Sequence, residues 1–208
     1  MMEDKKVIKL PRPFLSGGLS LVEAILVRRS VREFEPTPLQ LFHISQLLWA
    51  AQGITRTEGN LKSVPSAGGT FPLEVYLVVG ESGLETVEAG VYHYDPEFNI
   101  LTLHLSGDLR NDLAEASMGQ DPIVAAPVSI VICAVNDRTL NRYNQRGERY
   151  VDMEVGHAGQ NIYLQATALN LGTVAVGAFR DEQVRTLLQL EPNTKPLYIM
   201  PVGVAGII

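Results

Sequence analysis

Residues 28–34 read Arg28-Arg29-Ser30-Val31-Arg32-Glu33-Phe34 and place three guanidinium groups and one hydroxyl within five positions of a chain whose net charge is −6. In an extended segment side chains alternate, so Arg28, Ser30 and Arg32 would share one face. Two forked cations around a hydroxyl suit a phosphate group. In a helix Ser30 would turn away and the cluster would be an ordinary solvated surface. Taken alone, the string favours the solvated surface.

The flanking residues favour the extended geometry. The pattern Ser20-Leu21-Val22-Glu23 is a capping box, which predicts a helix from Ser20 to about Arg28 or Arg29. Pro36 disfavours helical geometry at the residue before it, so we expect an extended path through residues 30–36. The arginine cluster is therefore expected at the exit of a helix, in the phosphate-facing arrangement.

Composition predicts a single globular domain over residues 1–208, with 46% hydrophobic residues for its core. Apolar runs such as Val128–Val135 are much shorter than the roughly 20 residues of a membrane span. The charged residues at the start precede no apolar stretch, so we expect no signal peptide and a cytoplasmic location. A pI near 5.2 argues against a nucleic-acid partner.

The remaining elements predict an α+β fold, because segregated helices accompany strands joined by hairpins or long excursions. Thr37 is expected to cap a second helix, with Pro38 at its first position and its end near Gly53. Residues 54–72 are expected to form an irregular loop. We expect strands over residues 73–79, 90–95, 99–105, 127–135, 173–176 and 197–202, and helices over residues 107–118, 149–171 (capped by Gly172) and 181–190.

The chemistry of common enzymes is missing from the sequence. No GxGxxG, Walker or GxSxG motif is present, and the single Cys133 lies in an apolar run where a core role is expected. Asp152 and Glu154 diverge on the predicted helix and are interpreted as solvated charges. We predict no metal, because the histidines lack partners at ligand spacing: His43, His93, His104 and His157.

The stretch Ser66-Ala67-Gly68-Gly69 has two interpretations. It can be a flexible turn in which the glycines adopt positive φ. It can also be a loop whose backbone N–H groups approach a planar polar ligand closely. The turn is the more favoured interpretation of the stretch alone.

Five motifs follow one another along the chain: RRSVREF at residues 28–34, PSAGGTFPLEVYLVV at 65–79, GVYHYDP at 90–96, GHAGQNIYLQATALNLG at 156–172 and AVGAF at 175–179. Together they resemble the nitroreductase family, most closely its SagB-type, azoline-dehydrogenase-like branch. The resemblance covers nearly the whole chain from residue 20 onward. The resemblance implies a mostly antiparallel central sheet flanked by helices, in a homodimer with two FMN molecules at the subunit interface.

The resemblance also implies roles for the motif residues. Arg28 and Ser30 would hold the FMN phosphate and ribityl end, Arg29 would lie near the same groups, and Arg32 would face the N1–C2=O edge of the ring. Reduced flavin carries negative charge at N1, which a fixed cation stabilises. The other subunit's loop would line the isoalloxazine through Pro65, Ser66, Ala67, Gly68 and Gly69, and Val176 and Gly177 would contact the ring near N5 and O4.

The resemblance implies an oxidoreductase that passes hydride from NAD(P)H through flavin N5 to an oxidised acceptor such as a nitroaromatic or quinone. No catalytic side chain is required, because hydride moves directly between the nicotinamide and the flavin. Two alternatives remain open: dehydrogenation of azoline heterocycles in modified peptides, and non-enzymatic flavin binding.

Two features of the sequence bear on that site. Many nitroreductases have basic residues after the last strand, yet no Lys or Arg follows Lys195, which would leave more of the phosphate binding to Arg28 and Arg29. Gln160 and Asn161 would either face the flavin or form hydrogen bonds across the dimer interface, and the second role is favoured.

Overall fold

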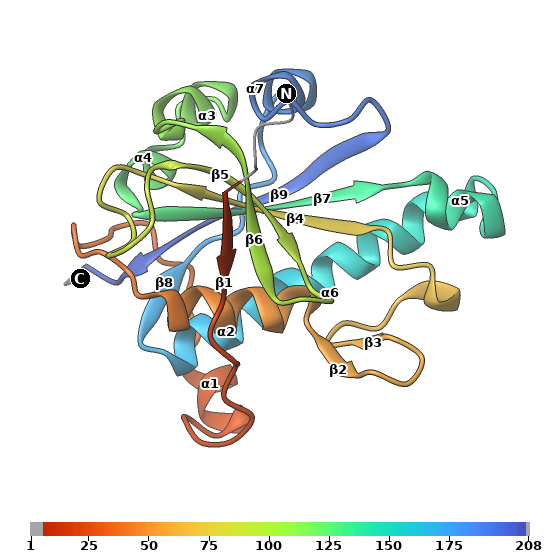
Figure 1. The fold of residues 1–208 in the computed structure, drawn as a ribbon, viewed down its shortest axis with the longest axis horizontal. Helices are drawn as coiled ribbons and strands as arrows, with labels where there is room; N and C mark the ends of the chain where they lie inside the picture. The colour runs from red at the N-terminus through yellow and green to blue at the C-terminus, as the bar shows by residue number, and fades with distance from the viewer. Residues whose placement is uncertain (1–5, 207–208) are drawn as a thin grey trace.

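The computed structural model describes residues 6–206 and contains a seven-stranded sheet in the order β1-β6-β5-β4-β7-β9-β8. Every neighbouring pair of strands in this sheet is antiparallel. Figure 1 shows α1, α2 and α6 on one face and α3, α4 and α7 on the other. The fold is thus the predicted α+β arrangement, a mostly antiparallel sheet flanked by helices.

The elements follow one another with short connections. The strands are β1 (Val7–Lys9), β2 (Ile54–Arg56), β3 (Leu61–Lys62), β4 (Leu73–Val79), β5 (Gly90–Asp95), β6 (Ile100–Ser106), β7 (Val128–Val135), β8 (Leu171–Thr173) and β9 (Thr194–Val204). The helices are α1 (Leu21–Val27), α2 (Leu41–Gln52), α3 (Arg110–Ala116), α4 (Asp121–Ala125), α5 (Asp137–Tyr143), α6 (Arg146–Ala168) and α7 (Asp181–Leu187). Within residues 6–206, no helix combines the length and apolarity needed to cross a membrane.

The two faces of the sheet carry separate hydrophobic cores. Leu77, Ile130 and Met200 point toward α2 and α6, whereas Val78 and Val131 pack with α3, α4 and α7. Because successive strand residues alternate between faces, the continuous apolar runs of β4 and β7 fill both cores. Cys133 is fully buried in the second core, as its apolar surroundings predicted.

Several sequence predictions are confirmed closely. Ser20 caps α1, and the reciprocal hydrogen bonds of the capping box with Glu23 are both present. Strands β4 and β5 have the predicted limits, and α2 ends before Gly53 as expected. Local sequence patterns were sufficient in these places, because the capping box spans four residues and the two strands span seven and six.

The predicted start of the second helix is wrong. Gln40, and not Thr37, precedes the first helical residue Leu41. Leu39 is fully buried in a bridge with Leu84, and its N–H donates to the Gly83 carbonyl. This long-range pairing holds the chain extended through the position where Pro38 would have opened a helix.

The predicted C-terminal cap of the long helix is also wrong. Helix α6 ends at Ala168, and Asn170 adopts the left-handed conformation with φ 58°. Gly172 lies in β8, where an added Cβ would come within 2.6 Å of the Val31 side chain. The glycine at 172 therefore permits a close approach between β8 and the arginine-rich segment.

Residues 54–72 are more ordered than predicted. They contain the β2–β3 hairpin and a 3₁₀ turn over Ala67–Gly69. Strand β1, helix α5 and helix α4 were not expected, because each is short and carries little periodic signal of its own.

Candidate functional site

Tyr163 on α6 joins three parts of the chain at one point. The Arg28 guanidinium lies 5.1 Å from the centre of the Tyr163 ring, and the Ser30 Oγ lies 3.1 Å from its hydroxyl. The Ala175 N–H donates to the same hydroxyl at 2.7 Å. Helix α6 thus holds the exit of α1 beside the turn after β8, and Arg28 and Ser30 share a face as predicted.

The segment after α1 is extended from Ser30 to Glu35, as predicted, but the chain bends at Pro36, where the Thr37 N–H donates to the Glu35 carbonyl at 2.8 Å. Ser30 forms a parallel bridge with Thr173, and Phe34 forms an antiparallel bridge with Ala205. The Val31 N–H donates to the Thr173 carbonyl at 2.9 Å. Hydrogen bonds near both ends of the segment therefore hold it against β8 and the end of β9, which fixes where its side chains point.

The three arginines of this segment differ in their contacts. Arg29 donates from Nη1 to the Leu26 and Arg28 carbonyls, so it caps the end of α1. Arg32 is exposed, and among the described residues neither Arg28 nor Arg32 forms an ion pair with a carboxylate. Arg28 and Arg32 consequently remain available to an anionic group.

Val176 and Gly177 lie directly beyond the Ala175 contact. The Val176 side chain is buried, and its N–H and carbonyl both pair with Ile199. Gly177 is exposed, and within residues 6–206 its N–H donates to no acceptor. An added Cβ at Gly177 would meet only ordinary contacts, at 3.5 Å or more. Of the two residues, Gly177 has the free donor.

The loop of residues 65–69 is a second site region. Gly68 and Gly69 adopt positive φ of 61° and 65°, so the turn interpretation of these glycines is confirmed. The Gly68 carbonyl accepts a hydrogen bond from Arg142 Nη1 at 2.9 Å. The Phe71 N–H donates to Ser66 Oγ at 2.9 Å, which closes the loop. Pro65, Gly68 and Gly69 are exposed, whereas Ser66 and Ala67 are half-buried.

These two regions contact different turns of α6. The arginine segment, residues 28–34, meets α6 at Tyr163, while Ser66 lies beside Glu154. Nine residues of α-helix span about 13 Å. One chain therefore does not bring residues 28–32 together with residues 65–69, although both face the same helix.

The interpretation of Glu154 as a solvated charge is wrong. Only 2% of this residue is exposed, and its Oε1 has no hydrogen-bond partner within the described chain. Burial raises the pKa of Glu154 to about 7, against smaller opposing effects of Ser66 and Lys62. The prediction failed because the loop of residues 65–69, distant in sequence, covers this side of α6. Asp152 is exposed as expected.

Asn161 has a role that sequence reasoning missed. Its Nδ2 donates to the carbonyls of Ala50 and Ser63, at 3.1 and 3.3 Å. It therefore ties α6 to α2 and to the segment leading into residues 65–69. An amide among the apolar residues of the second half of α6 was the available signal, but its partners are far away in sequence. Gln160 is exposed.

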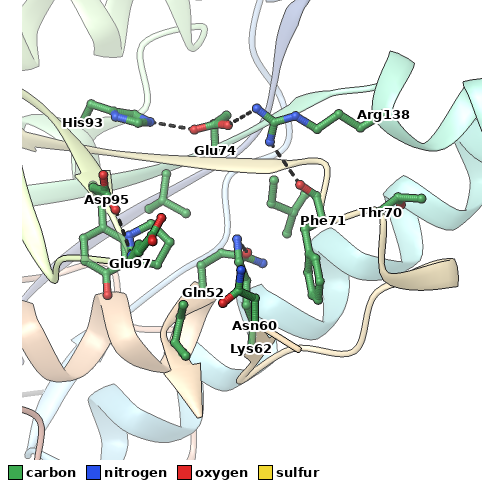
Figure 2. A pocket seen from close by; sticks show the side chains of 15 residues that line it. Gln52, Asn60, Lys62, Thr70, Phe71, Glu74, His93, Asp95, Glu97 and Arg138 are labelled. Carbon is green, nitrogen blue, oxygen red and sulfur yellow. Dashed lines mark hydrogen bonds and ion pairs between the residues drawn. The ribbon is translucent and has the colours of Figure 1, made fainter. Parts of the chain in front are cut away.

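A cavity of about 420 Å³, lined in part by Thr70 and Phe71 directly after the loop, was not anticipated. Figure 2 shows Glu74 between His93 and Arg138: His93 Nε2 lies within hydrogen-bond distance of the Glu74 carboxylate, at 2.6 Å, and Arg138 forms an ion pair with it at 2.5 Å. Burial opposes the charge of Glu74, but these two partners lower its pKa. Burial lowers the pKa of Lys62, which donates to Gln52 in the same cavity. Within residues 6–206, no three side chains of His, Cys, Asp or Glu gather in a metal-binding group.

Comparison with known proteins identifies relatives in sequence. The protein MJ1384 of Methanocaldococcus jannaschii, provisionally named a nitroreductase, is 45% identical over 97% of this chain and 98% of its own length. The microcin B17-processing protein McbC of Escherichia coli is 29% identical over 67% of this chain. That match covers 53% of McbC, so the chain spans about half of this relative.

The fold and the family agree with these relatives. A solved Ralstonia eutropha structure, also provisionally named a nitroreductase, has 30% identity and a TM-score of 0.85, with 97% of this chain and 90% of that chain covered. The model of the nitroreductase family matches residues 25–204, a span that includes the arginine segment, the loop of residues 65–69 and Tyr163. The resemblance drawn from the motifs is confirmed, and the chain belongs to the nitroreductase family of oxidoreductases.

Proposed function

We propose that this chain is an FMN-dependent oxidoreductase that takes hydride from NAD(P)H and passes it to an oxidised organic acceptor such as a nitroaromatic or quinone. The chain forms a single FMN-binding domain. It acts as a homodimer, with FMN at the subunit interface. The observation that carries the proposal is the joint attachment of Arg28, Ser30 and the turn before Gly177 to Tyr163.

The donor set at this point fits FMN. A phosphate carries negative charge, and Arg28 offers a guanidinium with no carboxylate partner among the described residues, next to the Ser30 hydroxyl. The polar edge of a flavin ring accepts hydrogen bonds, and the exposed N–H of Gly177 is free to donate within the described chain. Groups that can bind the phosphate and a group that can bind the ring thus lie around one tyrosine.

A second copy of the chain would complete the site. Residues 65–69 contact α6 about 13 Å along the helix from Tyr163, so the loop and the arginine segment of one chain lie apart. Helix α1 also exposes a row of apolar side chains beside the arginine segment, at Leu21, Val22, Ile25, Leu26 and Val27. An apolar surface of this kind marks a protein interface, and a twofold axis would bring the partner's loop to the arginine segment.

The roles of the chain follow from this arrangement. FMN, when bound, supplies the hydride-carrying chemistry. Arg28 and Ser30 hold its phosphate end, Arg32 stabilises negative charge on the ring edge, and Gly177 orients the ring through its N–H. Arg29 supports the cluster by fixing the end of α1. Residues 65–69 of the second copy exclude water from the ring.

The spectrum of the purified protein tests this proposal. We expect a bound flavin that is released as FMN on denaturation and is bleached by NADH or NADPH under anaerobic conditions. A protein that stays colourless after incubation with FMN contradicts the proposal. Bound FMN that neither nucleotide reduces favours a non-enzymatic flavin-binding role.

A second candidate function is oxidation of azoline heterocycles in a modified peptide. It is favoured by the match to McbC, which is named as a microcin B17-processing protein. The comparison covers about half of McbC, so its activity is not transferred by the match alone. Anaerobic mixing of the oxidised flavoprotein with an azoline-containing peptide separates the two: bleaching by the peptide supports dehydrogenation, and bleaching by NAD(P)H alone supports the leading proposal.

A further inference from the structure

A cluster of arginines and tyrosines lies beside the loop of residues 65–69. It consists of Arg142 and Tyr143 at the end of α5, and Arg146, Arg149 and Tyr150 on the first turns of α6. The Tyr143 and Tyr150 rings meet edge to face, with centres 5.1 Å apart. Arg142 lies 5.7 Å from the Tyr143 ring centre and Arg146 lies 5.9 Å from that of Tyr150.

The cations of this cluster have no anionic partners within the described chain. Arg138, one turn earlier, is paired with Glu74, but Arg142, Arg146 and Arg149 form no ion pair with a described carboxylate. All three are exposed. Three unpaired guanidiniums within eight residues are conspicuous in a chain of net charge −6, and they create a local positive field.

The cluster is attached to the loop directly. Arg142 Nη1 donates to the Gly68 carbonyl at 2.9 Å, and an added Cβ at Gly68 would come within 2.5 Å of the Tyr143 hydroxyl. In the proposed function this loop lines the flavin ring, which the nicotinamide must reach. The cluster therefore lies where the remaining part of that co-substrate would extend.

We propose that Arg142, Arg146 and Arg149, with the two tyrosine rings, bind the adenosine diphosphate part of the nicotinamide dinucleotide. This inference rests on the proposed function, because the loop contact places the cluster only if residues 65–69 line the flavin. Guanidiniums bind phosphate oxygens in a forked geometry, and tyrosine rings offer apolar surface to an adenine base. Placing the phosphates at this cluster leaves the nicotinamide end free to reach the ring.

The test uses ADP, which carries the groups shared by NADH and NADPH. The variant Arg146→Gln/Arg149→Gln removes two cations and leaves the Arg142 contact with Gly68 intact. We expect it to weaken ADP binding, measured by calorimetry on the FMN-loaded full chain, by about tenfold. We expect the KM for NAD(P)H to rise by a similar factor while kcat stays within about twofold, and ADP to compete with the nucleotide.

Two further variants separate charge from folding. Arg146→Lys/Arg149→Lys keeps the positive charge, so it should bind ADP within about threefold of the parent protein. Arg185→Gln removes an arginine of α7 that pairs with Glu182, far from the loop, and should change neither ADP binding nor KM. Flavin content measured on every variant confirms an intact flavin site.

The outcomes distinguish the inference from the function on which it rests. Bound and reducible FMN together with unchanged ADP affinity and KM in the glutamine variant overturns the inference and leaves the function standing. Binding of an acidic peptide that ADP does not displace also overturns it. Absence of bound FMN overturns the proposed function and, with it, the inference that rests on it.

Discussion

The hydroxyl of Tyr163 lies 3.1 Å from Ser30 Oγ and accepts the N–H of Ala175 at 2.7 Å, so one side chain of α6 positions both the arginine segment and the turn that leads to Gly177. The Arg28 guanidinium lies over the ring of the same tyrosine. The hydroxyl and the ring thus have separable tasks, which a single substitution can isolate.

We expect Tyr163→Phe to keep the ring under Arg28 but to release Ser30 and Ala175. The Ala175 N–H then loses its acceptor, so the free energy of unfolding should fall by about 1–2 kcal/mol. FMN should bind roughly threefold to tenfold more weakly, because the two contacts proposed for it, at Ser30 and at Gly177, are no longer held in place. Flavin fluorescence titration and urea unfolding measure the two effects. Tyr92→Phe removes a hydroxyl that donates to Glu88 and should affect stability alone.

Alanine substitutions of the three arginines in residues 28–32 should have different effects on the flavin. Arg28→Ala removes the unpaired cation over Tyr163 and should lower FMN affinity by about tenfold or more. Arg29→Ala should have a smaller effect on affinity, because its guanidinium is engaged by the Leu26 and Arg28 carbonyls. Arg32→Ala should retain flavin but make its reduction potential more negative. Equal loss of flavin from all three variants would contradict this division.

The buried carboxyl of Glu154 makes stability depend on pH. Its folded-state pKa of about 7 lies above the ordinary pKa of a glutamate, 4.5, so the folded protein holds the proton more tightly than the unfolded chain does. The free energy of unfolding should therefore fall as pH rises from about 4.5 through 7, by at most about 3 kcal/mol. Above pH 7 the folded protein carries the whole free-energy cost of the buried, ionised Glu154 carboxylate.

Urea unfolding between pH 5 and 8 measures this effect. Glu154→Gln cannot ionise, so it should lose the corresponding slope and be more stable than the parent protein at pH 8. Asp152→Asn, at an exposed position on the same helix, is the matched control and should keep the slope. An unchanged slope in the Glu154→Gln variant would show that the carboxyl is already ionised in the folded protein.

Sequence reasoning succeeded where signals are local and failed where long-range packing decides. The capping box of Ser20 and the extended path before Pro36 were predictable, because each depends on residues within one turn. The burial of Glu154 was not predictable, since the loop that covers it lies far away in sequence. The contacts of Tyr163 could not be predicted for the same reason, because nothing in a helical tyrosine identifies residues 30 and 175 as its partners.

The two glycines near the arginine segment should respond differently to alanine. In Gly172→Ala the new Cβ would lie 2.6 Å from Val31, so we expect a loss of about 1–3 kcal/mol in the free energy of unfolding. In Gly177→Ala the nearest atom is 3.5 Å away, so stability should be unchanged. FMN affinity should nevertheless fall in Gly177→Ala, because the added methyl group occupies the approach to the free N–H. Thermal unfolding and flavin titration distinguish the two variants.

The apolar face of α1 should be required for both assembly and flavin binding. Val22 is 75% exposed and Leu26 is 70% exposed, one turn apart, so Val22→Glu/Leu26→Glu places two charges on that face. Burying these charges between two chains would be costly, so we expect a monomer by light scattering. In the proposed site residues 65–69 of a second chain cover the ring, so the monomer should also lose FMN, although its circular dichroism stays that of the folded protein. The substitution Val124→Glu, at an exposed apolar position on α4 on the opposite face of the sheet, should leave both properties unchanged. A monomeric variant that still holds FMN at parental affinity would show that one chain suffices for the site, and would remove the reason for assigning residues 65–69 to the partner.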